Sequence, residues 1–128
     1  MKKILVADDS PSWVRHHSFN VKYILGEENV EIFEAFSARE ADKIISCNID
    51  KPFDIIFTDM QMEADFLPLN AGEWLIKQIQ FYKEYENTNI VIISASPIIE
   101  KLAQKYNVNY IPKRMCQTTE PYTKILEG

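Results

Sequence analysis

Four charged residues each come directly after a short apolar run, and together they could hold a metal ion and react with a phosphoryl group. They are Asp8 and Asp9 after residues 4–7, Asp59 after 53–58, and Lys113 after 108–112. If these runs are parallel strands of one sheet, their carboxyl ends meet at one edge, where open α/β sheets bind ligands. The sequence therefore predicts three carboxylates and one ammonium at that edge.

Carboxylates that lie within several ångströms of one another repel, and a fold tolerates them when a cation neutralises their charge. Mg²⁺ suits such a site because it prefers one or two carboxylates together with water and phosphate oxygens, and Mn²⁺ is the alternative ion. A carboxylate can then act as a nucleophile on phosphorus while the metal and an ammonium neutralise the equatorial oxygens. Lys113 would be that ammonium.

Taken singly, each of these residues also has an ordinary explanation. Asp8 or Asp9 alone fits a solvated acid beside a helix N-terminus. Asp59 alone fits a loop acid, and Lys113 alone fits a surface lysine. Only the combination indicates a site.

Composition and charge bound the class of protein. The chain has 128 residues, of which 46% are hydrophobic and 26% charged, so we expect one domain over residues 1–128. A net charge of -5 without a basic stripe argues against direct binding of nucleic acid. No apolar run is long enough for a signal peptide or a membrane span. Cys47 and Cys116 lack metal-ligand spacing and read as reduced thiols, which favours the cytoplasm.

Segments of helical period separate the apolar runs. We expect strands near 3–7, 30–36, 53–58, 89–94 and 108–111, and helices over 11–25, from 37, from 72 to about 85, from 96 to 107, and from about 119 to 126. Ser10 with Pro11 marks the first helix start, and Gly26 its end. Ser37 to Glu40 forms a capping box. The alternation predicts an α/β fold, a parallel sheet with helices on both faces.

The motifs, in this order, resemble the receiver domain of bacterial two-component response regulators over nearly the whole chain. The matching segments are ILVADDS at 4–10, DIIFTDMQM at 54–62, IISA at 92–95 and YIPK at 110–113. The resemblance implies a five-stranded parallel sheet with the flavodoxin-like order 2-1-3-4-5. It also implies a signalling switch that phosphorylates and dephosphorylates itself, rather than a metabolic enzyme.

The resemblance assigns a role to each site residue. Asp59 would accept a phosphoryl group from a histidine kinase or a histidine phosphotransfer protein. The Mg²⁺ ligands would be Asp9 directly, Asp8 through water, Asp59, and the backbone carbonyl of Gln61. Lys113 would pair with the phosphoryl group, Ser94 would be the switch hydroxyl and Tyr110 the switch aromatic, while Arg15 matches a position that is often basic.

The implied partners are the kinase or phosphotransfer protein and an unknown downstream protein that binds the surface of the fourth helix, fifth strand and fifth helix. Nucleic acid and membrane are not expected partners, and a homodimer is left open. The ending Leu126-Glu127-Gly128 resembles a cloning remnant, so an output domain in the natural protein is also left open.

Two departures from the family pattern stand out. Lys113 is followed by Arg114 where the family has proline, which weakens the expected placement of the lysine head group. Residues 63–71 form an insertion of about five residues, within which Phe66, Leu67 and Leu69 are expected to pack on something nearby. The third helix is expected to carry an aromatic stripe of Trp74, Phe81 and Tyr85. The loop either folds onto this stripe, or the loop and the stripe together form a surface that binds a partner.

Other functions are weaker but distinct. A phosphorylation-independent interaction module, a pseudo-receiver, would act through the inserted loop and the aromatic stripe. A phosphatase of haloacid dehalogenase type is disfavoured because no second acid lies two residues after Asp59. A flavin carrier is disfavoured because no phosphate loop follows the first strand.

His16 and His17 are adjacent, so helical geometry should point their side chains apart, and His17 fits a buried histidine whose ring is hydrogen-bonded.

Overall fold

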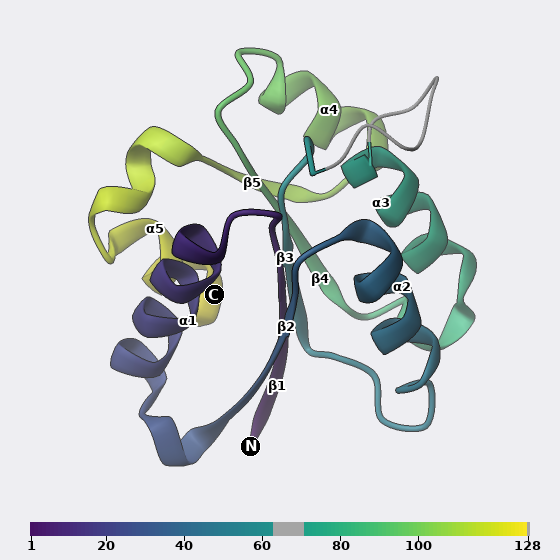
Figure 1. The fold of residues 1–128 in the computed structure, drawn as a ribbon, viewed down its shortest axis with the longest axis horizontal. Helices are drawn as coiled ribbons and strands as arrows, with labels where there is room; N and C mark the ends of the chain where they lie inside the picture. Colours follow the sequence, from purple (N-terminus) through teal and green to yellow (C-terminus); the bar gives the residue numbers. More distant parts are fainter. Residues whose placement is uncertain (63–70, 128) are drawn as a thin grey trace.

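The computed structural model describes residues 1–62 and 71–127 and shows a five-stranded, all-parallel sheet (Figure 1). The strands are β1 (Lys2–Ala7), β2 (Val30–Ala35), β3 (Ile55–Thr58), β4 (Asn89–Ser94) and β5 (Asn109–Pro112). Their order in the sheet is β2-β1-β3-β4-β5. The predicted fold class and strand order are therefore confirmed, and each strand lies within two residues of its expected limits.

The strand register decides which residues meet at the carboxyl edge. Ala7 at the end of β1 pairs with Thr58 at the end of β3, so Asp8 and Asp59 leave the sheet at the same level. On the other side of β3, Ser94 at the end of β4 pairs with Pro112 at the end of β5. Lys113 therefore also leaves the sheet at this edge.

Within residues 1–62 and 71–127, five helices cover the sheet in two layers (Figure 1). One face carries α1 (Pro11–Leu25) and α5 (Glu120–Glu127), and the other carries α2 (Ala38–Ser46), α3 (Ala71–Phe81) and α4 (Ile99–Tyr106). Alternate residues of each strand enter opposite cores, because successive side chains of a strand point to opposite faces. Ile4 and Val6 pack under α1 and α5, whereas Leu5 packs under the other three helices.

The local signals for helix ends are confirmed at several positions. The Ser10 hydroxyl accepts a hydrogen bond from the N–H of Trp13, with Pro11 beginning α1. Gly26 ends this helix with a φ of 91°, which favours glycine. The Ser37 hydroxyl accepts from the N–H of Glu40 at 3.0 Å, as a capping serine does. The last helix, α5, covers Glu120–Glu127, within one residue of the expected limits.

Two helix limits differ from the prediction. Helix α3 ends at Phe81, and a separate 3-10 turn covers Lys83–Tyr85. Tyr85 is buried there, and its hydroxyl donates to the carbonyl of Ile45 at 2.7 Å, so the chain leaves the helix to turn this ring into the core. Helix α4 begins at Ile99 rather than at Ser96, because the Ser96 hydroxyl accepts from the N–H of Ile98 in a preceding turn.

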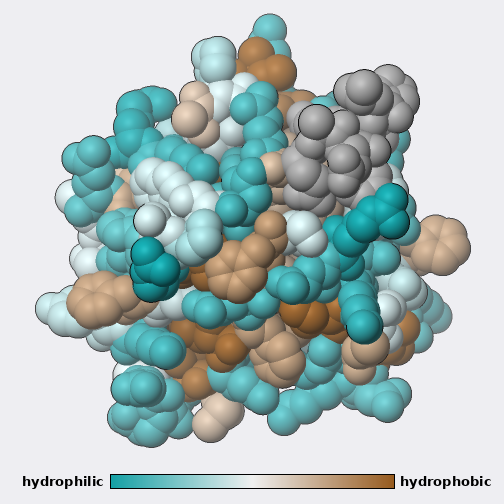
Figure 2. All heavy atoms as spheres, in the orientation of Figure 1, coloured by the Kyte–Doolittle hydropathy of each residue, from teal (hydrophilic) through white to brown (hydrophobic). Residues whose placement is uncertain are grey.

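The predicted aromatic stripe on the third helix does not form one surface. Tyr85 is buried, Trp74 is half-buried against the core, and Phe81 is 84% exposed. On the face shown in Figure 2, hydrophobic residues appear as separate areas among hydrophilic ones. The predictions for Phe66, Leu67 and Leu69 lie outside the described residues.

Among the helices of residues 1–62 and 71–127, none has both the length and the apolar character that crossing a membrane requires.

Candidate functional site

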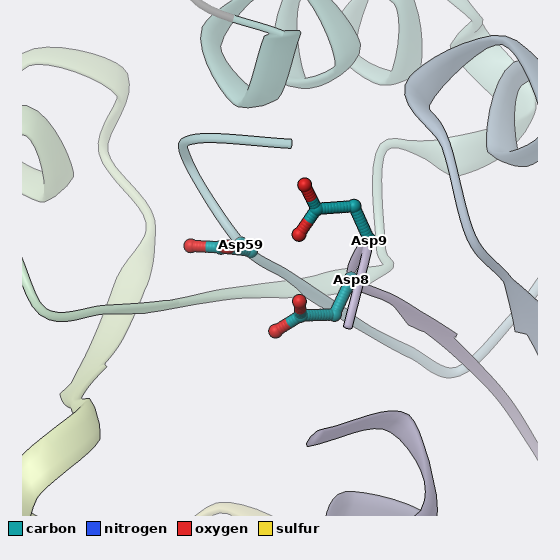
Figure 3. A group of neighbouring side chains, drawn as sticks. All are labelled: Asp8, Asp9 and Asp59. Atoms are coloured by element: carbon teal, nitrogen blue, oxygen red, sulfur yellow. The ribbon is translucent and has the colours of Figure 1, made fainter. Parts of the chain in front are cut away.

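Three carboxylates converge at the carboxyl edge of the sheet (Figure 3). Asp8 and Asp9 follow β1 and Asp59 follows β3, and each contributes an oxygen that lies within 4.8 Å of the others. Asp8 and Asp59 are buried, while Asp9 is exposed. The structure thus brings together the acids that the sequence placed at the ends of separate strands.

Asp8 is oriented by the start of α1. Its Oδ1 accepts a hydrogen bond from the N–H of Ser10 at 2.9 Å, so the turn that caps the helix also fixes this carboxylate. Its Oδ2 is buried and accepts no hydrogen bond from the described residues, but it lies 3.2 Å from Nζ of Lys113. A buried carboxylate oxygen without a hydrogen bond is costly unless a cation lies nearby.

Asp59 is held on both of its oxygens. Oδ1 accepts from the N–H of Met60 at 2.8 Å, and Oδ2 accepts from Nζ of Lys113 at 3.3 Å. The backbone N–H of Asp59 donates to the carbonyl of Ala7, which continues the pairing of β1 and β3 by one residue. The carboxylate is therefore fixed in direction at the mouth of the acidic cluster.

The electrostatics of the cluster reflect both burial and repulsion. Burial and the neighbouring Asp8 raise the pKa of Asp59, and Lys113 and the backbone N–H of Gln61 offset this only in part. Asp9 is exposed overall, but partial desolvation of its carboxyl group, followed by the neighbouring Asp8, also raises its pKa. Burial lowers the pKa of Lys113, but Asp59 and Asp8 raise it by more. The single ammonium of Lys113 does not neutralise the three carboxylates, so the remaining negative charge would attract another cation.

The residues present fit a hard divalent ion. The donor set is carboxylate oxygens only, which Mg²⁺ and similar ions prefer. Asp8 Oδ2 lacks a hydrogen bond within the described chain, and the pKa values of Asp9 and Asp59 are raised. The acidic cluster is therefore compatible with metal binding.

Glycine at position 72 allows α3 to pack directly on the end of β3. The N–H of Gly72 donates to the carbonyl of Met60 at 3.0 Å. A Cβ at this position would lie 2.4 Å from both the Asp59 carbonyl oxygen and Cα of Met60. Both are backbone atoms that cannot rotate away. The sequence predicts a helix start at Gly72 but does not indicate this contact with the end of β3.

The predicted switch residues lie near the same edge. Ser94 is buried at the end of β4, and its hydroxyl accepts from the N–H of Ser96 at 3.1 Å. Tyr110 on the edge strand β5 is 37% exposed, so it is not a core tyrosine in this structure. Gln61 is exposed directly after Met60, and Arg15 lies on the exposed face of α1, where it donates to the Ser12 hydroxyl.

The two adjacent histidines lie closer together than predicted. Their ring centroids are 6.1 Å apart, and both rings contact Trp13 and Tyr122. The expectation that helical geometry points them apart is therefore wrong, because both turn toward the seam between α1 and α5. The expectation of a buried, satisfied His17 is correct: it is 2% exposed, and its Nδ1 lies 2.6 Å from the Tyr122 hydroxyl.

This histidine gives a testable pH dependence. Burial, followed by His16 and Lys113, lowers the pKa of His17 from 6.5 to about 3. The unfolded chain therefore binds more protons between these values, and stability falls as the pH falls through them. Between pH 7 and pH 5 we expect the wild type to lose about 2 kcal/mol more than His17→Gln, in urea denaturation at each pH. Equal losses in the two proteins would show that His17 is not held neutral.

Comparison with known proteins identifies the fold. No family model and no curated protein sequence matches the chain. The chemotaxis response regulator CheY4 of Vibrio cholerae matches with a TM-score of 0.73 and 24% identity, over 99% of this chain and 97% of that one. The phosphorylated cyanobacterial phytochrome response regulator RcpA matches with a TM-score of 0.78 and 18% identity, over 98% and 91%.

A response regulator receiver domain protein from Clostridium thermocellum matches similarly, with a TM-score of 0.66 and 21% identity, over 99% of this chain and 98% of that one. These likenesses cover essentially the whole of each chain. The chain therefore has the fold of response regulator receiver domains, as its sequence motifs indicated.

Proposed function

We propose that this chain is a phosphorelay receiver, in which Asp59 accepts a phosphoryl group from a phosphohistidine of a sensor kinase or a histidine phosphotransfer protein. The observation that carries the proposal is the position of the Asp59 carboxylate. It is fixed by the N–H of Met60 and the ammonium of Lys113, with two further acids at its side. The receiver fold and the sequence motifs support the same function.

The transfer is a displacement at phosphorus. A carboxylate oxygen of Asp59 forms the new P–O bond while the P–N bond to the donor imidazole breaks, and the electron pair of that bond leaves with the imidazole nitrogen. The leaving nitrogen takes up a proton from solvent, so the products are an acyl phosphate on Asp59 and a neutral histidine on the donor. Water reverses the modification by attacking phosphorus, which releases inorganic phosphate and restores the carboxylate.

Each residue of the site has a task in this reaction. Asp9, Asp8, Asp59 and the backbone carbonyl of Gln61 would hold Mg²⁺ or Mn²⁺. The ion, when bound, supplies positive charge to the phosphoryl oxygens as they develop negative charge. Lys113 supplies the second positive charge, since its Nζ already lies 3.3 Å from Asp59 Oδ2 and can shift to a phosphoryl oxygen.

The switch acts through Ser94 and Tyr110. When the Ser94 hydroxyl turns to donate to a phosphoryl oxygen, it gives up its contact with the N–H of Ser96 and draws the β4–α4 loop toward the site. Tyr110 then moves from the surface into the space vacated. A groove of about 510 Å³ between α4, β5 and α5 includes Tyr110 in its lining, so a downstream protein bound there would sense this movement.

The proposed setting is the bacterial cytoplasm, with a kinase or phosphotransfer protein as the donor and a protein as the output partner. The alternative is a pseudo-receiver that binds partners without phosphorylation through residues 63–71 and the aromatic residues of α3. Tyr85 is buried while Phe81 is exposed, so the two rings do not share the aromatic surface that this alternative requires.

Phosphorylation of Asp59 can be tested directly. On incubation with Mg²⁺ and a small phosphodonor such as acetyl phosphate, we expect the intact mass of the wild type to rise by one phosphoryl group. Asp59→Asn should show no gain, because an amide lacks the nucleophilic carboxylate. Asp50→Asn, at an exposed acid away from the cluster, is the matched control and should behave as the wild type.

Two results would contradict the proposal. Absence of a mass gain in the wild type with Mg²⁺ present would favour the pseudo-receiver. A gain that persists in Asp59→Asn would place the modification elsewhere in the chain.

A further inference from the structure

The ammonium of Lys113 has an aromatic neighbour that the sequence did not indicate. Its Nζ lies 5.0 Å from the centre of the Trp13 indole, in addition to its contacts with Asp8 and Asp59. The side chain of Lys113 is only 15% exposed. A cation at this distance from an indole is attracted by the negative face of the ring, more strongly when water is excluded.

Trp13 is itself held in place by the seam between α1 and α5. Its ring stacks on His17 with centroids 5.4 Å apart and an angle of 26° between the planes, and it meets the edge of His16 at 5.5 Å. His17 in turn lies 2.6 Å from the Tyr122 hydroxyl. A chain of contacts therefore runs from buried Tyr122 on α5 through His17 and Trp13 to Lys113.

We propose that Trp13 is a positioning residue for Lys113, holding its ammonium at Asp59 for phosphoryl transfer; this rests on the function proposed above. Lysine has a long flexible side chain that loses much rotamer freedom when its head group is fixed. The two carboxylates attract the ammonium but would also accept it in other positions, because point charges impose little direction. The indole occupies space beside the ammonium and favours the one arrangement that touches all three groups.

The position of Lys113 can be measured without any phosphorylation. The indole ring current should shift the ε-methylene protons of Lys113 upfield in the NMR spectrum of the wild-type protein. In Trp13→Leu this shift should disappear, and in Trp13→Tyr a smaller upfield shift should remain. Phe19→Leu is the matched control, since it removes an exposed aromatic ring from the same helix and should leave the Lys113 signals unchanged.

The consequence for the reaction is tested by a double-mutant cycle. Trp13→Leu should slow phosphorylation of Asp59 about tenfold. Trp13→Tyr should restore most of the rate, because a tyrosine ring also attracts a cation. In a Lys113→Met background, Trp13→Leu should produce no further loss, since the group that Trp13 positions is gone.

Unchanged Lys113 signals in Trp13→Leu would overturn the proposal. It would also be overturned if the double variant slowed phosphorylation by the full product of the two single-variant factors. If Trp13→Leu does not fold, Trp13→Tyr and Trp13→Phe provide the test. In both variants the upfield shift of the Lys113 ε-methylene protons must be smaller than in the wild type, because a single ring replaces the indole. If the wild type accepts no phosphoryl group, the proposed function fails, while the chemical shifts still decide whether Trp13 holds Lys113.

Discussion

Gly72→Ala is expected to lower the free energy of unfolding by about 3 kcal/mol and to disturb the proposed metal site. The added Cβ would lie 2.4 Å from the carbonyl oxygen of Asp59 and from Cα of Met60. Neither atom can move without shifting the segment that carries the Asp59 carboxylate. The helix must therefore move away from the sheet, or the end of β3 must move away from Asp8.

The measurement is urea denaturation at neutral pH, repeated with Mg²⁺ in excess. Gly26→Ala serves as the control, because Gly26 needs glycine for a different reason. Its φ is 91°, and the atoms nearest to a Cβ there belong to the flexible side chains of Asn29 and Glu28. We expect Gly26→Ala to cost about 1 kcal/mol and to leave Mg²⁺ binding intact. Gly72→Ala should instead lose part of the stabilisation by Mg²⁺ as well.

A Gly72→Ala protein that is as stable as the wild type would show that α3 can shift without cost. One that is destabilised but binds Mg²⁺ normally would show that the helix moves and the end of β3 does not. Either result would contradict the view that Gly72 fixes the position of Asp59 through the backbone.

The sequence predicted the central strands β1, β3 and β4 because each is a short, nearly continuous apolar run, the usual pattern of strands buried on both faces of a parallel sheet. The edge strands β2 and β5 carry polar residues such as Glu31, Glu34 and Asn109 within the run. It predicted the acidic edge because Asp8 and Asp59 stand one residue past the ends of strands that pair in register. Capping residues such as Ser10 and Ser37 located helix starts because their hydrogen bonds are local. These features depend on neighbours in the sequence or on a single repeated geometry.

The contacts that the sequence did not predict join residues far apart in the chain. Trp13 reaches Lys113 across 100 positions, and nothing near either residue signals the other. Tyr85 continues the helical period of α3, but its hydroxyl finds a carbonyl on α2, and this tertiary bond ends the helix early. His17 and Tyr122 meet for the same kind of reason. Packing between helices and strands decides these contacts, and the periodicity of the sequence does not indicate which helices and strands pack together.

Lys113→Met is expected to lower the free energy of unfolding by about 3 kcal/mol in the absence of divalent ions, because it leaves buried carboxylates without their cation. Methionine keeps most of the volume of the lysine stem, so the loss reports the charge. Asp59 and Asp8 raise the pKa of Lys113 by more than burial lowers it. The stabilisation is therefore fully present below the ordinary lysine pKa of 10.5 and is lost only as the pH rises through the folded-state pKa.

The matched control is Lys124→Met, since Lys124 also pairs with an acid, Glu120, but both side chains are 76% exposed. Surface pairs of this kind contribute little, and we expect a change below about 0.5 kcal/mol. Mg²⁺ should restore more stability to Lys113→Met than it adds to the wild type, because the variant has one positive charge fewer at the cluster. Equal effects of Mg²⁺ on both proteins would indicate that Lys113 and the ion act on different groups.

Lys113→Met should also slow phosphorylation of Asp59 by about a hundredfold, as loss of one charge-stabilising donor does at other reaction centres. The effect on stability is measured without a phosphodonor and the effect on rate with one, so the two roles of Lys113 separate. If the variant were destabilised but phosphorylated at the normal rate, Lys113 would serve only to neutralise Asp8 and Asp59 in the resting protein. If both change, the same ammonium that pairs with Asp8 and Asp59 also stabilises charge on the transferred group, since its Nζ lies 3.3 Å from Asp59 Oδ2.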